Sequence, residues 1–287
     1  MSLFKCPVCQ KELIKKDHCY QCENKHNYDL AAKGYVNLLL ANQKHSVDPG
    51  DCKEMIEARA LFLKLNYYGF LRQCILENIL KYAPSETFNF CDLACGEGYY
   101  TNYLHQEVNK IKNMNTIGID ISKYAILEAC KKKREMNLDQ IEFCIGNLMN
   151  LPFLNDSFSI MLNCFALFDE KEFYRVLKDK GFYIRVLPDA YHLYDLKKKL
   201  YKNVILNVMK EKTINGFHLI DEIHIEKDIT LKTKDEIYNL FTMTPYYYKT
   251  SQEDKKKLLE LDCLTTKAAF VLLIYQKGEN EYENATR

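Results

Sequence analysis

The feature that most constrains the fold is a regular alternation of short apolar runs and helix-length segments in the middle of the chain. Such alternation is typical of a mainly parallel, doubly wound sheet with helices on both faces. We therefore expect an α/β, Rossmann-like fold. The predicted strands are 88–93, 116–120, 141–145, 159–163 and 181–187, with a last strand at 268–276, and the predicted helices between them are 99–108, 122–134 and 170–177.

Two motifs stand at the carboxyl ends of predicted strands, which is where such sheets bind their ligands. The first strand contains Asp92 and leads into the small-residue loop 94–98, which contributes Gly96, Glu97 and Gly98. The second strand ends at Asp120, where a carboxylate can accept hydrogen bonds from ribose hydroxyls. Together the two motifs predict a nucleoside-binding site.

The chemistry of the loop indicates which nucleoside. The loop matches neither the dinucleotide pattern GxGxxG nor the phosphate loop GxxxxGK[ST]. Asp92 and Glu97 would repel a pyrophosphate but would favour a sulfonium or an ammonium group, so we expect S-adenosylmethionine (SAM). Asp120 would then bind the ribose, and Asn147 would flank the adenine. The alternatives are that Asp92 is a core or capping acceptor and that Asp120 caps a helix.

Four of the twelve cysteines lie in the first 22 residues. Three thiolates and one imidazole, or four thiolates, form a tetrahedral zinc site. Spacing alone leaves two ligand sets open: Cys6, Cys9 and Cys22 with His26, or Cys6, Cys9, Cys19 and Cys22. The alternative is that these residues are ordinary buried thiols.

Charge and hydropathy exclude some classes of protein. There are 40 basic and 39 acidic residues, a formal net charge of +1, so composition alone does not indicate nucleic-acid binding. The sequence contains no run of about 18 apolar residues, so it predicts no membrane-spanning helix. The N-terminus lacks the apolar region of a signal peptide, so we expect a cytoplasmic protein.

Motifs along nearly the whole chain resemble one known family, the bacterial 23S rRNA guanine-N1 methyltransferases of the RlmA (RrmA) type. The resemblance begins with the cysteine cluster and the sequence Cys-Gly-Glu-Gly-Tyr-Tyr at 95–100. One departure from the wider methyltransferase pattern is Ala94, where a glycine is common. The other matching segments are 33–39, Asp48–Asp51, Met55, Ala58–Arg59, Leu151–Phe153, Pro188, His192–Leu193 and Met243–Pro245.

The resemblance implies a class I SAM-dependent methyltransferase with a small zinc-ribbon-like module at the N-terminus. The implied boundaries are 1–45 for a zinc-binding RNA-recognition module and 46–287 for the methyltransferase domain, with core strands at about 88–187 and a decoration with the last strand over 190–277. The implied zinc ligands are Cys6, Cys9, Cys22 and His26. For the cofactor the resemblance implies Tyr68, Gly96, Glu97, Asp120 and His192.

The implied reaction is methylation of N1 of a guanine in a domain II hairpin of 23S rRNA. The alternatives are methylation of a small molecule or a protein, and a non-enzymatic zinc-dependent RNA-binding protein. A homodimer is left open, and the sequence names no catalytic base. Candidate contacts to the RNA are the aromatic residues Phe165, Phe168 and Tyr246–Tyr248, Asn163 at the base edge, and a lysine-rich helix over Lys197–Lys212.

Overall fold

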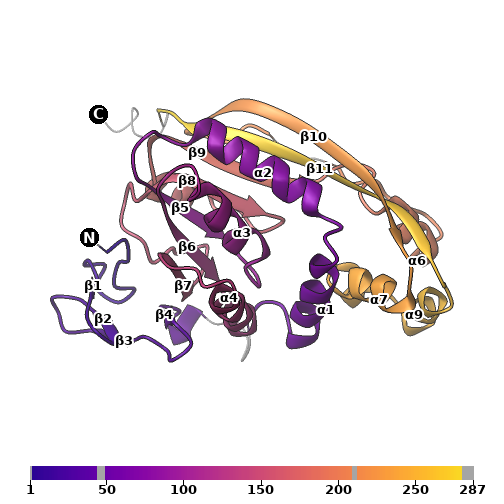
Figure 1. Ribbon diagram of the computed structural model, residues 1–287, viewed down its shortest axis with the longest axis horizontal. Helices are drawn as coiled ribbons and strands as arrows, with labels where there is room; N and C mark the ends of the chain where they lie inside the picture. Colours follow the sequence, from indigo (N-terminus) through magenta and orange to yellow (C-terminus); the bar gives the residue numbers. More distant parts are fainter. Residues whose placement is uncertain (1, 44–48, 209–211, 280–287) are drawn as a thin grey trace.

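The computed structural model describes residues 2–43, 49–208 and 212–279. Its centre is an eight-stranded sheet in the order β10-β11-β9-β8-β5-β6-β7-β4 (Figure 1). Neighbouring strands are parallel from β4 to β9, whereas β11 is antiparallel to both β9 and β10. The strands are β4 (Tyr35–Asn37), β5 (Phe88–Leu93), β6 (Met114–Asp120), β7 (Ile141–Ile145), β8 (Phe158–Cys164), β9 (Leu177–Pro188), β10 (Phe217–Leu231) and β11 (Leu264–Lys277).

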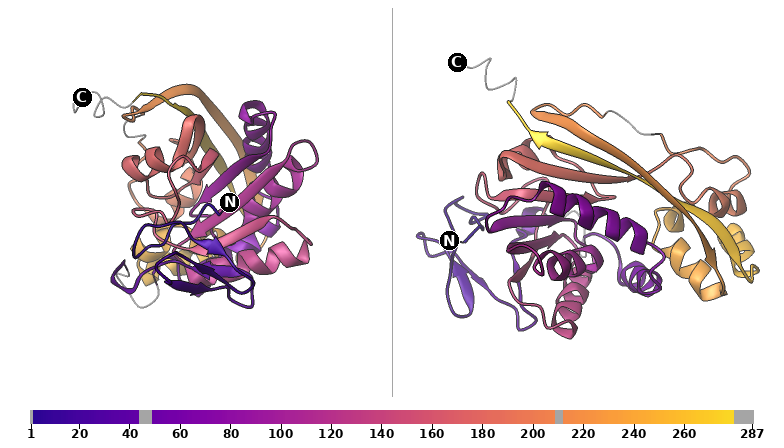
Figure 2. Two further views of the ribbon diagram at one scale, coloured as in Figure 1. Left: turned by 90° about the vertical axis from the view of Figure 1, so that its left-hand side faces the viewer. Right: turned by 45° about the horizontal axis from the view of Figure 1, so that its top comes forward.

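Helices cover both faces of this sheet, as the alternation predicts (Figure 2). One face is buried by α2 (Gly69–Tyr82) and α3 (Tyr99–Val108), and α5 (Glu170–Val176) packs on the other. α4 (Lys123–Glu135) packs against β6 and β7. The side chain of Ser122 accepts a hydrogen bond from the N–H of Ala125, which caps α4. No helix in the described ranges has the length and hydropathy needed to cross a membrane.

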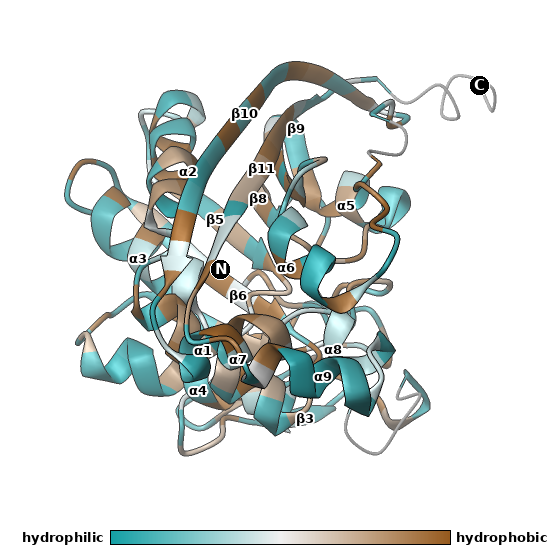
Figure 3. Cartoon of the chain, turned by 90° about the vertical axis from the view of Figure 1, so that its right-hand side faces the viewer, coloured by the Kyte–Doolittle hydropathy of each residue, from teal (hydrophilic) through white to brown (hydrophobic). Residues whose placement is uncertain are grey.

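The region 190–277, expected to be a decoration with the last strand, contains another full strand of the sheet, β10, which is 15 residues long. Three isoleucines, Ile223, Ile225 and Ile229, alternate along it with polar residues and point toward the core face. Figure 3 shows this alternation as bands along the strand. The helices of this region are α6 (Tyr194–Leu200), α7 (Lys234–Thr242), α8 (Tyr246–Lys249) and α9 (Gln252–Leu259).

The helix expected over Lys197–Lys212 is shorter than predicted, and one of its lysines is buried, whereas Lys198 and Lys199 are exposed. α6 ends at Leu200, and residues 209–211 lie outside the described part of the chain. Lys197 is buried, and its ammonium donates to Asn207 Oδ1 at 2.9 Å. This lysine therefore holds the segment after α6 in place and is not free to contact a phosphate.

The N-terminal module shares the core of the larger domain. It has a small sheet of β1 (Ile14–Lys15), β2 (Cys19–Gln21) and β3 (Asn27–Asp29), followed by β4 and the short helix η1 (Ala41–Gln43). β4 pairs with β7 in the main sheet. Phe4 packs on Phe153, and the Tyr20 hydroxyl donates to Glu142 Oε1 at 2.7 Å. The boundary at residue 45 stays a prediction, and the two parts form one continuous apolar cluster.

Candidate active site and metal centre

The loop between β5 and α3 brings the main-chain atoms of Gly96 to the sheet edge. Gly96 has φ +56° and Gly98 has φ +75°, both in the left-handed region that favours glycine. A Cβ at Gly98 would lie 3.0 Å from that of Ala129, so this glycine lets α3 approach α4. A Cβ at Gly96 would have only Arg59 Nη1, at 3.7 Å, as a neighbour within 4 Å. The loop therefore has open space beside Gly96, as a cradle for a ligand requires.

Asp120 is fixed at the end of β6 by two main-chain hydrogen bonds. Its Oδ2 accepts from the N–H of Gly96 at 2.9 Å, and its Oδ1 accepts from the N–H of Ser122 at 2.8 Å. Burial raises the pKa of this carboxyl, while these N–H donors act in the opposite direction. Each oxygen keeps a free lone pair, so the fixed carboxylate can still accept ribose hydroxyls.

A counter-charge reaches this loop from α1 (Lys53–Lys64). Arg59 is ion-paired with Asp51 and interacts electrostatically with Glu97 and Asp120. Glu97 is buried and also lies 3.9 Å from Lys132 Nζ. Arg59 is a site residue for which the sequence alone indicated no role, because α1 is far from the loop in the sequence.

Asp92 lies inside the sheet and is 2% exposed. Its Oδ2 accepts a hydrogen bond from Thr101 Oγ1 at 2.5 Å. Burial raises the pKa of Asp92 to about 7, against the lowering effect of Thr101. One oxygen of Asp92 thus serves as the core acceptor considered above, and its contact with a cofactor stays a prediction.

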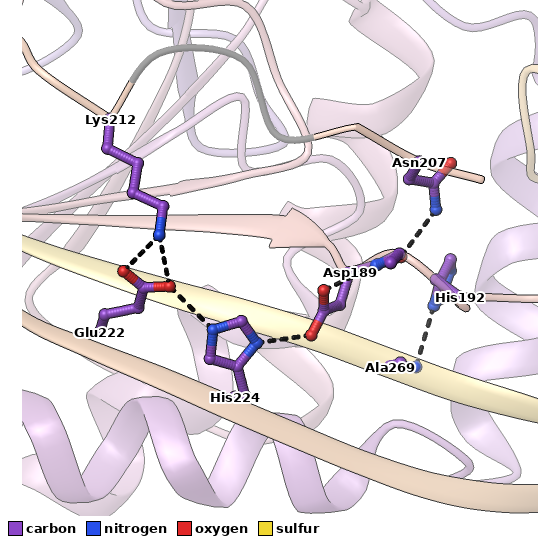
Figure 4. Close-up of polar contacts among 8 residues, drawn as sticks. Asp189, His192, Asn207, Lys212, Glu222, His224 and Ala269 are labelled. Carbon is purple, nitrogen blue, oxygen red and sulfur yellow. Dashed lines mark hydrogen bonds and ion pairs between the residues drawn. The ribbon is translucent and has the colours of Figure 1, made fainter.

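Tyr68 and His192, which are distant in the sequence, meet on the ring of Phe270 in β11. Ring centroids of Tyr68 and His192 lie 4.9 and 4.7 Å from that of Phe270. His192 Nδ1 accepts the N–H of Ala269 at 3.2 Å (Figure 4), so its proton is on Nε2. Burial lowers the pKa of His192 to about 3, so the ring is neutral. The buried Tyr68 hydroxyl has no hydrogen-bond partner among the described residues.

Asn147 follows β7, directly beside the end of β6. Asp120 and Ile145 are partners in the sheet register, and the N–H of Gly146 donates to the carbonyl of Asp120. The Asn147 side chain accepts the N–H of Met149 at 3.0 Å, which shapes the turn. The structure thus brings the loop 94–98, Asp120 and Asn147 to neighbouring strand ends. Tyr68 and Phe270 lie in a core cluster, and His192 packs on Phe270.

These residues fit SAM on three observations. Gly96 leaves open space, Asp120 presents a fixed carboxylate, and the Tyr68 hydroxyl is buried without a partner among the described residues. An unpaired buried hydroxyl is costly, and a bound ligand is one way to satisfy it. The individual contacts of Tyr68, Asp92, Glu97, Gly98, Asn147 and His192 to the cofactor stay predictions.

The metal-ligating atoms converge in the N-terminal module. Those of Cys6, Cys9, Cys22 and His26 all lie within 4.8 Å of one another, and this group does not include Cys19. The Cys9 and Cys22 sulfurs are 3.6 Å apart, and His26 Nδ1 lies 3.4 Å from the sulfurs of Cys6 and Cys22. Tetrahedral zinc with Zn–S bonds of about 2.3 Å requires sulfurs about 3.8 Å apart.

Hydrogen bonds further support this donor set. The N–H of Lys11 lowers the pKa of Cys9 to about 6, which favours its thiolate. The Tyr28 hydroxyl lies 3.3 Å from the sulfur of Cys6, where it can donate to a thiolate. Gln10 and Lys25 adopt φ +64° and +62° and close the two turns that carry the ligands. The set of three thiolates and one imidazole is suited to zinc.

Comparisons with known proteins agree with both sites. A family model described as the N-terminal part of RlmA, a zinc ribbon, matches residues 4–47, and one described as a methyltransferase domain matches 84–258. YxjB of Bacillus subtilis, named as a proposed 23S rRNA (guanine-N(1)-)-methyltransferase, is 30% identical over 205 residues, which are 70% of this chain and 69% of that protein. The chain belongs to the RlmA family.

A second relative is the 23S rRNA (guanine(748)-N(1))-methyltransferase of Streptomyces fradiae. It is 27% identical over 67% of this chain and 65% of its own length. A demethylmenaquinone methyltransferase of Oceanobacillus iheyensis is 33% identical, but over only 31% of this chain and 40% of its own length. The chain is thus a SAM-dependent methyltransferase with a zinc-ribbon module.

Proposed function

We propose that this enzyme transfers a methyl group from SAM to N1 of a guanine in a domain II hairpin of 23S rRNA. The proposal depends on one observation: a zinc-ribbon module and a SAM-type sheet edge share a single apolar core in one chain. The relatives from Bacillus subtilis and Streptomyces fradiae are both named for methylation of a guanine N1 of 23S rRNA. The relative named for a small-molecule acceptor matches less than a third of the chain.

The residues of the chain would act mainly by positioning. SAM supplies the methyl group on a sulfonium carbon. Asp120 and the Gly96 main chain would hold the nucleoside half of SAM, while Arg59 balances the carboxylates around it. Holding an acceptor nitrogen in line with the methyl group lowers the barrier by orientation. The zinc-ribbon module, with seven lysines and four acids in residues 1–45, would contact the RNA.

The test is transfer of radiolabelled methyl to 23S rRNA from cells that lack this gene, followed by primer extension. N1 methylation blocks Watson–Crick pairing, so reverse transcriptase should stop one nucleotide before the modified guanine. An Asp120→Ala variant is the cofactor-binding control, and it should lose both SAM binding and the stop. If the wild-type protein binds SAM but gives no label in rRNA, the RNA assignment is wrong and a small-molecule acceptor should be sought.

A further inference from the structure

The residue that follows β8 lies at the edge where the acceptor must approach. β8 lies between β5 and β9, and Asn163 pairs with Leu93 at the start of the cofactor loop. The chain leaves the sheet at Cys164, and the N–H of Phe165 donates to the carbonyl of Val186 in β9 at 3.0 Å. Phe165 is therefore anchored directly at the carboxyl end of the strands, one strand away from the Gly96 loop.

The backbone of Phe165 is held in an unfavourable conformation. Its φ is +62°, in the left-handed region that bulky residues rarely occupy. The buried Asn163 imposes this turn, since its Oδ1 accepts the N–H of Ala166 at 3.2 Å and its Nδ2 donates to the carbonyl of Leu167 at 2.8 Å. The side chain of Asn163 thus shapes the loop, and its contact with a base edge stays a prediction. Strain of this kind is costly and persists where the surroundings enforce it.

This turn displays an aromatic ring beside the predicted cofactor residues. The ring of Phe165 lies 5.5 Å from that of Phe270, the residue on which Tyr68 and His192 meet. Phe165 nevertheless remains 43% exposed. It therefore joins the cofactor-side aromatic cluster while much of its own surface stays open to an incoming ligand.

Two other aromatic candidates, Phe168 and Tyr247, lack this combination of exposure and contact with Phe270. Phe168 is partly buried; it packs edge-on against Phe173 and stacks with Tyr183, with the Arg185 guanidinium 5.2 Å from its ring centroid. Tyr247 donates to Glu54 and has the ammonium of Lys255 over its ring at 4.0 Å.

We infer that Phe165 is the platform on which the acceptor purine stacks when it receives the methyl group. The inference rests on the proposed function. A base in structured RNA must leave its stack to reach a SAM site, and it then needs a surface to replace its former neighbours. An exposed aromatic ring provides that surface for any base, because every base has a π face.

The test is single-turnover methylation of the rRNA hairpin by four proteins: wild type, Phe165→Tyr, Phe165→Leu and Leu167→Ala. Tyr keeps the ring, and Leu keeps an apolar side chain without it. Leu167 is 74% exposed on the same loop and controls for surface changes there. We expect Phe165→Leu to lower the rate by roughly 10- to 100-fold, while Tyr and the Leu167 variant stay within about threefold of wild type.

Two further measurements separate stacking from a structural role. SAM affinity and the melting temperature should be unchanged in Phe165→Leu. A hairpin with 2-aminopurine at the target should show a fluorescence change on binding wild type that is reduced with this variant. Wild-type methylation rates in Phe165→Leu, or an equal loss of SAM binding, would overturn the inference. If wild-type protein does not methylate the hairpin, the proposed function fails instead, because that outcome precedes any comparison of variants.

Discussion

At the residue scale, the cofactor loop is shaped by unusual backbone and by a concentration of charge. Ala94 adopts φ +58° at a position where related enzymes often carry glycine. Three carboxylates, those of Asp51, Glu97 and Asp120, act on the single guanidinium of Arg59. Both features lead to predictions that do not require the RNA substrate.

Replacing Ala94 by glycine should stabilise the protein. Left-handed backbone costs an alanine ~1–2 kcal/mol, while glycine loses about 0.5–1 kcal/mol through greater freedom of the unfolded chain. We expect the free energy of unfolding to rise by about 0.5–1 kcal/mol, measured by urea denaturation. Ala60→Gly, in the middle of α1, is the control and should lower it by about 1 kcal/mol. A loss of stability in Ala94→Gly would contradict the strain argument.

Removing the charge of Arg59 should weaken SAM binding. Arg59 lowers the pKa of the buried Asp120, so without the guanidinium this carboxyl would be protonated more readily and would accept the ribose hydroxyls less well. We expect Arg59→Leu to raise the Kd for SAM by about 10- to 100-fold in calorimetry, with Arg59→Lys in between. Lys64→Ala, an exposed charge on the same helix, should have no effect. Equal Kd values for Arg59→Leu and wild type would show that Arg59 has only a structural role.

At the element scale, a cluster of charged side chains ties β10 to the segment that follows β9 (Figure 4). His224 on β10 contacts Asp189 at 2.6 Å through Nδ1 and Glu222 at 2.8 Å through Nε2. Lys212 also pairs with Glu222. These hydrogen bonds to the two carboxylates raise the pKa of His224, and His224 in turn lowers the pKa of Asp189. Both ring nitrogens can donate only while the imidazole is protonated.

The stability that His224 contributes should therefore depend on pH. Because the pKa of His224 is raised in the folded protein, its contribution to stability is fully present below the unfolded-state pKa of about 6.5. This contribution is lost as the pH rises through the folded-state pKa. The melting temperature of His224→Gln should fall further below that of wild type at about pH 6 than at about pH 9. His218→Gln, on the same strand but outside this cluster, should show a smaller change with pH. If the difference in melting temperature between wild type and His224→Gln grows toward alkaline pH, the prediction is wrong.

The elements that sequence analysis missed are those whose signal is not local. The strands from 88 to 187 were predicted because each is apolar and bounded by a loop or a helix. β10 was missed because its alternating isoleucines stand among charges at an exposed sheet edge, although this period of two is visible once sought. The role of Arg59 could not be predicted, since it depends on how α1 docks over a loop 37 residues later at Gly96.

At the scale of the whole molecule, the zinc-ribbon module and the methyltransferase sheet depend on each other. Phe4, Leu13 and Tyr20 are buried in the same cluster as Phe153 and Phe158. β4 extends the main sheet beyond β7. A small module of this kind has too little core to fold without a metal or a partner, and here it can use both.

Loss of zinc should thus lower the stability of the whole enzyme. We expect Cys22→Ser to bind less than one zinc per chain by elemental analysis, and to melt at a lower temperature while also binding SAM more weakly. Cys19→Ser is the matched control, because Cys19 stands outside the ligand group and should leave one zinc bound. Zinc loss in Cys19→Ser as well as in Cys22→Ser would instead support the four-cysteine ligand set, because Cys22 belongs to both sets and Cys19 only to that one.

The position of β11 has a consequence for the order in which the chain can mature during translation. Among the strands that the structure describes, β11 is the last to leave the ribosome, yet it lies between β9 and β10. Until β11 emerges, the edges of β9 and β10 that it pairs with stay open. Phe270, whose ring contacts both Tyr68 and His192, is also missing until then. Open edges invite wrong pairing in nascent chains. An interrupted nascent chain would carry a finished zinc module and an unfinished catalytic centre.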